Sequence, residues 1–156
     1  MILVIGDIIL DEYWFGSSNR LSPEAVVPVV NIEKKDMRLG GAGNVANNIQ
    51  SLGNKVHLIT SFGKDKKGKI ISSILKNNLI NYTNISVKKK FTNSKIRIIS
   101  SNNQIVRLDN DNHYKKFPNT NKKILETSII KKINDINLII ISDYDKGLIQ
   151  NDIKRI

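Results

Sequence analysis

Two hydrophobic patterns alternate along this chain. Short, continuous apolar runs are typical of buried strands in a parallel sheet, and they lie at 2–5, 56–61 and 138–141. The run at 138–141 is the clearest, and we expect it to be a buried strand. Apolar residues recur at helical spacing over 42–52, 66–79 and 122–134. Alternating strands and helices predict an α/β fold with a parallel sheet.

The predicted helices have recognisable ends. The apolar stripe of the first helix is expected to reach Leu52, and that of the second to reach Leu79. Asp65 is placed to act as the N-cap of the second helix. A further helix is expected to open at Asn151 and Asp152.

A hairpin-sized insertion separates the first strand from the first helix. Extended segments are predicted at 13–15 and 26–32, and Pro28 places the second of them at the edge of a sheet. A strand normally passes to its helix within a few residues. We therefore expect a lid over about 12–33, and an ordinary flap or an oligomer contact fits the same pattern. A second hairpin, with one wet face, is predicted over 91–109 from the alternation in KIRIIS and QIVRLD.

Small residues gather at the start of the first helix, in the segment LGGAGNVANNIQSLG. Gly40, Gly41 and Gly43 allow the backbone to approach a ligand closely, where the N–H groups of a helix start favour anionic or oxygen-rich groups. Asn44, in the first turn, carries a donor and an acceptor that suit a sugar hydroxyl. A tight turn before a packed helix explains the same glycines without a ligand.

Acidic residues follow two of the predicted strands. Asp7 and Asp11 follow the first strand, and Asp143 follows the late one. Ligands bind beyond the carboxyl ends of strands in open α/β sheets, and Asp11 could accept hydrogen bonds from sugar hydroxyls. Asp7 fits the capping of a loop equally well.

Three cations lie in the second predicted hairpin: Lys95, Arg97 and Arg107. If their face meets a ligand, they would hold a phosphate, with arginine binding it through two hydrogen bonds. If it faces bulk water, they serve solubility. The sequence leaves both interpretations open.

Composition indicates one globular unit. A chain of 156 residues with 40% hydrophobic residues is long enough for one core and short for two domains. It contains no cysteine, which excludes disulfides and thiolate sites. The N-terminus reads as a strand without a basic leader, and the apolar runs are too short to span a bilayer. We therefore expect a cytoplasmic protein with no membrane partner.

The net charge of +11 raises the question of nucleic acid as a partner. The basic residues are 20 Lys and 5 Arg, spread in small groups, and aromatic residues make up only 6% of the chain. Arginines that could read base edges and aromatic rings that could stack on bases are both scarce. The positive charge is therefore interpreted as a solvated surface, and no nucleic-acid partner is expected. A dinucleotide-binding module is also disfavoured, because the glycine cluster does not follow the first strand and lacks G-x-G-x-x-G.

Four motifs in this order resemble the N-terminal half of ribokinase-like carbohydrate kinases: GDIILDEYW, LGGAGNVANNIQSLG, FGKDKKG and ISDYDKG. Within that family, RLSPEAVVPVV, SKIRIIS, QIVRLD and SDYDKG are similar to the kinase domain of the bifunctional heptose-7-phosphate kinases and heptose-1-phosphate adenylyltransferases. The resemblance covers essentially residues 1–156. It implies a truncated ribokinase-like (Rossmann-like) parallel sheet with helices on its faces and a small β lid.

This resemblance implies an activity of the family, the ATP- and Mg²⁺-dependent phosphorylation of the anomeric hydroxyl of D-glycero-β-D-manno-heptose 7-phosphate in lipopolysaccharide synthesis. The substrate-binding residues that it implies are Asp11, Gly40, Gly41, Asn44, Lys95, Arg97, Arg107, Asp143 and Lys146. Asp11, Gly41 and Asn44 would hold sugar hydroxyls. The three cations of the second hairpin would face the 7-phosphate or the lid.

Two further implied residues follow the late strand, in SDYDKG. Asp143 would line the cleft, and Lys146 would steady phosphate charge. Asp145 stands where that branch usually has a small residue. Its negative charge opposes the role of Lys146.

The family's catalytic aspartate belongs to a Gly-Ala-Gly-Asp motif, and this motif does not occur after Gly43. The ATP-binding half and the adenylyltransferase domain are likewise expected to be absent. We therefore expect a sugar-kinase fragment that is inactive alone and binds neither ATP nor Mg²⁺ tightly. We expect it to bind a small-molecule sugar phosphate, and to pair as a homodimer through the lid or with a second chain that supplies the missing half.

Overall fold

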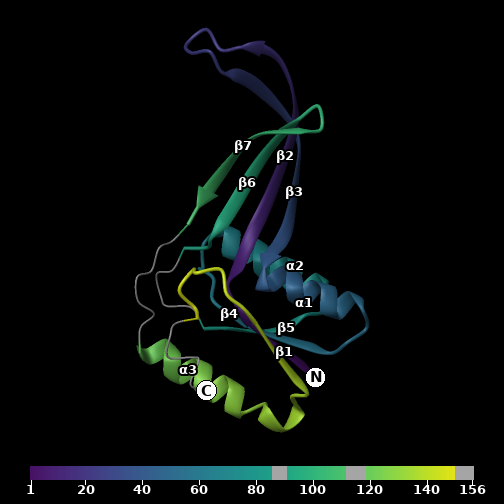
Figure 1. Ribbon diagram of the computed structural model, residues 1–156, viewed down its shortest axis with the longest axis vertical. Helices are drawn as coiled ribbons and strands as arrows, with labels where there is room; N and C mark the ends of the chain where they lie inside the picture. Colours follow the sequence, from purple (N-terminus) through teal and green to yellow (C-terminus); the bar gives the residue numbers. More distant parts are fainter. Residues whose placement is uncertain (86–90, 112–118, 150–156) are drawn as a thin grey trace.

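The computed structural model describes residues 1–85, 91–111 and 119–149, which form an α/β fold with two four-stranded sheets (Figure 1). The first sheet is parallel, in the order β5-β4-β1-β8. Its strands are β1 (Ile2–Gly6), β4 (Val56–Thr60), β5 (Asn81–Asn84) and β8 (Leu138–Ser142). The helix expected to open at Asn151 and Asp152 lies outside the described residues.

Helices cover both faces of the parallel sheet. In Figure 1, α1 (Ala42–Ser51) and α2 (Lys66–Asn77) lie on one face and α3 (Asn119–Ile130) lies on the other, followed by the short 3₁₀ helix η1 (Ile133–Asp135). Successive side chains of a strand point to opposite faces. Val4 therefore packs in the cluster with α1 and α2, whereas Leu3 and Ile5 pack in the cluster with α3.

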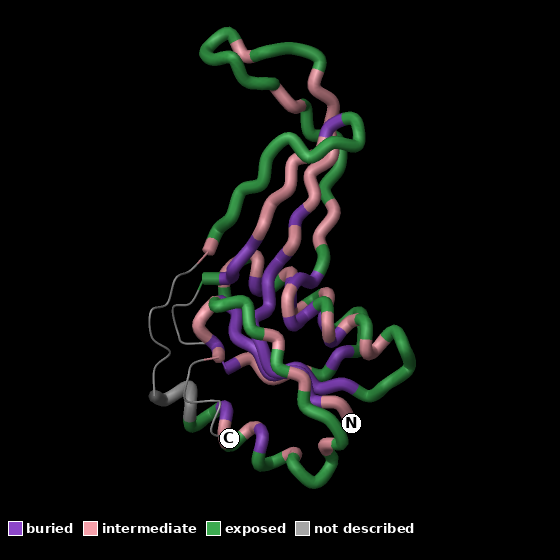
Figure 2. Tube along the Cα trace, viewed as in Figure 1, coloured by how far each residue is buried: buried purple, intermediate pink, exposed green. Residues whose placement is uncertain are grey.

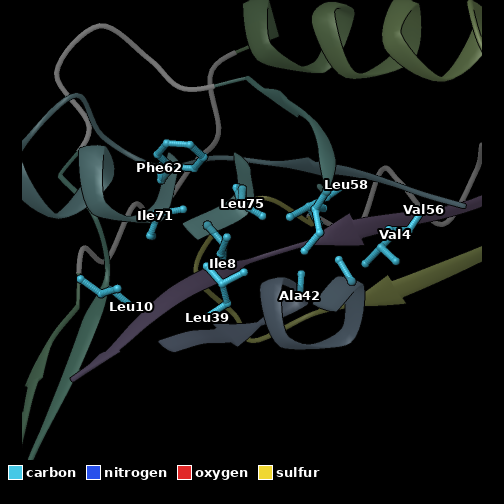
Figure 3. Close-up of a cluster of buried hydrophobic side chains, with 12 residues drawn as sticks. Val4, Ile8, Leu10, Leu39, Ala42, Val56, Leu58, Phe62, Ile71 and Leu75 are labelled. Atoms are coloured by element: carbon cyan, nitrogen blue, oxygen red, sulfur yellow. The ribbon is translucent and has the colours of Figure 1, made fainter. Parts of the chain in front are cut away.

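The larger cluster extends from the parallel sheet to the start of the second sheet. Figure 3 shows it reaching from Val4 and Val56 to Leu10, with Ala42 of α1 and Leu75 of α2 between them. Burying a large aliphatic side chain contributes about 1.5–3 kcal/mol. The two sheets are therefore joined by a shared apolar core at the point where β1 passes into the second sheet.

The ends of the helices differ from the predicted stripes. Asp65 is the N-cap of α2, as predicted, because its carboxylate accepts a hydrogen bond from the backbone N–H of Gly68 at 2.8 Å. The expected burial of Leu52 and Leu79 is wrong, since both side chains are exposed. Leu52 is the C-cap of α1, and Leu79 lies beyond the end of α2 with φ at 56°. Helical spacing no longer applies there.

The second sheet projects away from the three layers, in the order β3-β2-β6-β7 (Figure 1). Its strands are β2 (Ile8–Leu21), β3 (Pro28–Gly41), β6 (Ser94–Ser100) and β7 (Asn103–Asn110). The segments expected as a lid, 12–33 and 91–109, fall mostly within these strands. Beyond the core, much of this sheet is exposed (Figure 2).

The two hairpins of the second sheet match the predictions from the sequence to different extents. The β6–β7 hairpin is confirmed, but its single wet face is not, because all eight residues of β7 are exposed. Its turn residues Ser101 and Asn102 have φ values of 48° and 64°, as two-residue turns between twisted strands require. Pro28 does begin an edge strand. The first hairpin is longer than predicted, because the predicted extended segments 13–15 and 26–32 cover only part of β2 and β3.

Strand β8 is not the buried strand that its apolar run predicts. Leu138, Ile139 and Ile141 are 51%, 45% and 55% exposed, in contrast to the buried residues of β4. The cause is the position of β8 at the edge of the sheet, where it pairs with β1 and, among the described residues, with no strand on its other side. An apolar edge of this kind is a template for another chain.

An ion pair between a buried carboxylate and a partly exposed lysine fixes the second sheet to the helical layer. Lys67 Nζ of α2 lies 2.8 Å from Glu12 Oε1 of β2 and donates to Ser94 Oγ of β6 at 2.6 Å. Glu12 is buried and also accepts a hydrogen bond from the indole of Trp14 at 3.3 Å. Glu12 therefore neutralises Lys67, one of the three lysines in the first turn of α2, where the helix dipole disfavours positive charge.

Candidate functional site

A pocket of about 340 Å³ lies where the second sheet meets the start of α1. Elements distant in the sequence form its wall: β2, β3, α1, β6 and the loop after β8. The lining residues are Ile9, Asp11, Tyr13, Arg38, Leu39, Gly40, Gly41, Asn44, Lys95, Arg97 and Tyr144.

One face of the second sheet supplies the floor of this pocket. Alternate residues of a strand share a face, and most lining residues alternate in this way: 9, 11 and 13 on β2, 38 and 40 on β3, and 95 and 97 on β6. Leu39 and Gly41 also line the pocket, where β3 ends. Register brings them side by side, because Asp11 is opposite Arg38 on one neighbouring strand and opposite Lys95 on the other. The floor is therefore a continuous patch built from three strands.

Asp11 and Arg97 form the central ion pair of the floor. Arg97 Nη1 donates to Asp11 Oδ1 at 2.7 Å, and the two side chains are only 22% and 18% exposed. This hydrogen bond raises the pKa of the Arg97 guanidinium above its ordinary value, against the opposing effect of burial. Arg97 and Arg38 also lie 5.1 and 4.9 Å from the ring centroid of Tyr13, within range of cation–π attraction.

The glycines at the end of β3 are required by close approach. A β-carbon on Gly40 would lie 2.3 Å from Asp11 Oδ2, and one on Gly41 would lie 2.3 Å from the carbonyl oxygen of Asp7. Gly41 also has φ at 58°, which favours glycine, and it is the N-cap of α1. Asn44 is exposed in the first turn of that helix, where the helix dipole favours negative charge.

The charge of the lining residues is net positive. Lys95, Arg97 and Arg38 are set against the single carboxylate of Asp11. Lys95 is also 3.5 Å from Asp109, and Arg38 is paired with Asp36 at 2.6 Å. A wall with several N–H donors, one carboxylate and one exposed amide matches a ligand that carries both an anionic group and hydroxyls.

The pocket brings together six of the residues proposed from the sequence: Asp11, Gly40, Gly41, Asn44, Lys95 and Arg97. Arg107, Asp143 and Lys146 are not among its lining residues. Arg107 lies opposite Arg97 on β7 and pairs with Asp109 at 2.9 Å. Asp143 accepts a hydrogen bond from the N–H of Asp145, and Lys146 Nζ lies 2.7 Å from Asp111 Oδ2.

Tyr13, Arg38 and Tyr144 line the pocket and were not identified from the sequence. Two of them follow from the alternation of the strands, since Tyr13 lies two residues after Asp11 and Arg38 lies two residues before Gly40. Tyr144 is part of the ISDYDKG motif and lies beside Gly41, where a β-carbon would be 3.5 Å from its ring. Asp143 was chosen from that motif, and its neighbour is the residue that reaches the pocket.

Few acidic side chains in the described part of the chain gather where Mg²⁺ could be held. Among the residues that the structure describes, no group of three or more His, Cys, Asp or Glu side chains could hold a metal ion. Mg²⁺ is held by oxygen ligands, commonly one or two carboxylates together with substrate phosphates. Within the described ranges, no cluster of acidic side chains could hold Mg²⁺ by itself, and Asp11 is the single carboxylate of the pocket.

The sequence pattern of the pfkB family carbohydrate kinases matches residues 1–147, and the chain belongs to this family. It is 39% identical to the bifunctional protein HldE of Haemophilus influenzae (strain PittEE) over 150 residues, which are 96% of this chain and 31% of that protein. It is 36% identical to HldE of Vibrio vulnificus over the same length. The chain therefore spans about a third of these curated relatives, and the predicted resemblance is confirmed.

Solved structures of carbohydrate kinases share the fold. Phosphofructokinase-2 from Escherichia coli is similar with a TM-score of 0.67 and 17% identity, over 91% of this chain and 44% of that chain. A carbohydrate kinase from Agrobacterium tumefaciens is similar with a TM-score of 0.58 and 23% identity, over 70% and 34% of the two chains. The predicted α/β, ribokinase-like fold class is therefore confirmed. In the described ranges, the helices are too short or too polar to cross a bilayer.

Proposed function

We propose that this chain is the sugar-binding part of a kinase and that its pocket binds a phosphorylated sugar. The observation that carries the proposal is the meeting of Asp11 and Asn44 with Lys95 and Arg97 in one pocket. The family acts on carbohydrates with ATP and a metal ion. The likeness to HldE supports D-glycero-β-D-manno-heptose 7-phosphate as the particular ligand.

Each group in the pocket has a chemical task in this proposal. The Asp11 carboxylate accepts hydrogen bonds from sugar hydroxyls, while the amide of Asn44 both donates and accepts. Arg97 and Lys95 hold the phosphate, because guanidinium groups bind it through paired N–H donors and ammonium groups bind it as point charges. Roles for Arg107, Asp143 and Lys146 are proposed from the family resemblance alone.

The reaction proposed for the complete kinase is phosphoryl transfer from ATP to the anomeric hydroxyl, giving the 1,7-bisphosphate on the route to ADP-heptose and the lipopolysaccharide core. We propose that this chain alone does not catalyse it, because the sequence has no Gly-Ala-Gly-Asp motif after Gly43. Phosphoryl transfer depends on such positioning and charge stabilisation. Formation of heptose bisphosphate above a no-enzyme control would refute this part. The cytoplasmic location also remains a prediction.

We further propose that a second polypeptide completes the kinase along β8, or that two copies pair through the second sheet. The exposed apolar residues of the β8 edge support the first arrangement, and the exposed apolar residues at the end of the first hairpin support the second. Sedimentation of the chain alone, and after coexpression with the second half of a related kinase, would distinguish these arrangements. A monomer in both samples would contradict both of them.

Calorimetric titration tests the ligand. Heptose 7-phosphate should bind with a saturable heat, and unphosphorylated heptose should bind at least tenfold more weakly. Arg97→Gln should remove most of that difference, because a charged hydrogen bond contributes about 1.5–3 kcal/mol. Arg20→Gln, on an exposed part of the first hairpin and of the same sheet, is the matched control and should bind like the wild type. Equal affinity for the two sugars would refute the phosphate site.

A further inference from the structure

Asp7 is a buried carboxylate beneath the pocket that does not line it. It follows β1 directly and is 2% exposed. Its Oδ2 atom accepts hydrogen bonds from the backbone N–H groups of Tyr144 and Lys146, both at 3.1 Å. Its Oδ1 atom accepts from the N–H of Leu148 at 3.2 Å. Three alternate amides of one loop therefore bind a single side chain.

The backbone of Asp7 connects the same loop to α1. Its carbonyl oxygen accepts from the N–H of Ala42, the first residue of α1, at 2.9 Å. Its N–H donates to the carbonyl oxygen of Ser142 at 3.1 Å, where β8 ends. One residue thus holds both the start of the helix beside Asn44 and the loop that carries Tyr144.

Both held segments form part of the pocket wall. Gly41 and Asn44 contribute the helical side, and Tyr144 lies against Gly41 from the other side. Hydrogen bonds to a carboxylate are stronger than bonds between neutral groups. Loss of the carboxylate would leave three N–H groups without a charged acceptor and would release the Tyr144 side of the wall.

We propose that Asp7 is a positioning residue that shapes the sugar-phosphate pocket through the backbone of the 143–148 loop and the start of α1, without touching the ligand. The proposal rests on the proposed function of the pocket. It explains why two acidic residues four positions apart, Asp7 and Asp11, have different tasks. Asp11 faces the pocket, whereas Asp7 holds the wall that closes it.

The test compares Asp7→Asn with the wild type and with Asp65→Asn. Asp65 is a matched control because its carboxylate also accepts backbone N–H groups, from Gly68 and Thr92, and lies outside the pocket. Asp7→Asn should speed hydrogen exchange at the amides of 144, 146 and 148 at least tenfold. It should also weaken heptose 7-phosphate binding at least tenfold, whereas Asp65→Asn should bind within twofold of the wild type.

Each outcome decides one claim. Binding by Asp7→Asn within twofold of the wild type would overturn the positioning role. If the wild type itself binds no sugar phosphate, the proposed function fails, and the NMR signals of the Tyr144 ring decide the positioning role. A shift of these signals in Asp7→Asn would support the role, and unchanged signals would overturn it.

Two safeguards apply if Asp7→Asn does not fold. Asp7→Ser keeps a small acceptor and should show the same exchange and binding changes. If it also fails to fold, wild-type exchange decides, because the amides of 144, 146 and 148 should exchange at least tenfold more slowly than that of Asp145, whose partner is the exposed Asp143. Equal exchange at 144 and 145 would overturn the proposal.

Discussion

The carboxylate of Asp11 occupies the space that a side chain on Gly40 would need. The two residues lie on neighbouring antiparallel strands, and a β-carbon on Gly40 would lie 2.3 Å from Asp11 Oδ2. Such an approach is available only to glycine. Gly40, the second-last residue of β3, therefore makes room for the single carboxylate in the floor of the pocket.

Gly40→Ala should displace the Asp11 carboxylate and disturb its ion pair with Arg97. We expect heptose 7-phosphate to bind at least tenfold more weakly, with a loss of about 1–3 kcal/mol in the free energy of unfolding from overpacking. Calorimetric titration and urea unfolding measure the two effects. Gly53→Ala is the control, since Gly53 has φ at 80° and nothing within 4 Å of a β-carbon. It should lose about 1–2 kcal/mol of stability and keep normal binding.

Lys67→Met should destabilise the protein by leaving Glu12 buried without its cation. Removing one member of a buried ion pair costs about 3–5 kcal/mol, and we expect the lower end because Lys67 is partly exposed. Urea unfolding measures the loss. The double variant Glu12→Gln with Lys67→Met should recover at least half of it. If Lys67→Met alone is as stable as the wild type, this ion pair does not anchor the second sheet.

His57 should make stability fall in mild acid. Burial, together with the charge of Lys132, lowers the pKa of His57 to about 4, and its Nε2 atom lies 2.8 Å from Thr83 Oγ1. The unfolded chain takes up this proton near pH 6.5. Between pH 6.5 and 4 the unfolded state therefore binds more protons, and the free energy of unfolding decreases as pH falls.

An NMR titration of the His57 ring, with urea unfolding of His57→Gln as a comparison, checks this window. The variant should lose the His57 part of the decrease between pH 6.5 and 4. Titration of His57 near pH 6.5 would contradict the prediction.

Asp65 affects the free energy of unfolding at lower pH than His57 does. Burial acts to raise the pKa of Asp65, but hydrogen bonds from Thr92 and Gly68 outweigh it and lower the pKa, so its contribution is lost only as pH falls below its ordinary value.

Local patterns predicted the elements whose neighbours are close in sequence. The apolar stripe predicted α2 because Ile71 and Leu75 pack on one face, and the Asp65 cap needs only Gly68. The alternation of β6 and β7 predicted their hairpin, since a two-residue turn joins them. The polar residues 33–36 gave no strand signal, because this part of the edge strand β3 is mostly exposed and requires no apolar side chains.

Long-range pairing set the features that the sequence did not reveal. The apolar run of β8 matches that of a central strand, but its burial depends on whether another strand lies on its outer side. Likewise, Arg38 joins Asp11 in the pocket only through the register of β3 on β2. The sequence identified candidate binding residues at the ends of strands and at the start of α1. The parallel pairing of β6 with β2 then selected which cations face Asp11.

The central claim is that one pocket holds both the hydroxyl-binding and the phosphate-binding groups. Titration of ¹⁵N-labelled protein with D-glycero-β-D-manno-heptose 7-phosphate tests it most directly. We predict saturable shifts, with one common dissociation constant, at the amides of Asp11, Asn44, Lys95, Arg97 and Tyr144. Shifts confined to other surfaces, or no saturable shifts at these five amides, would contradict it.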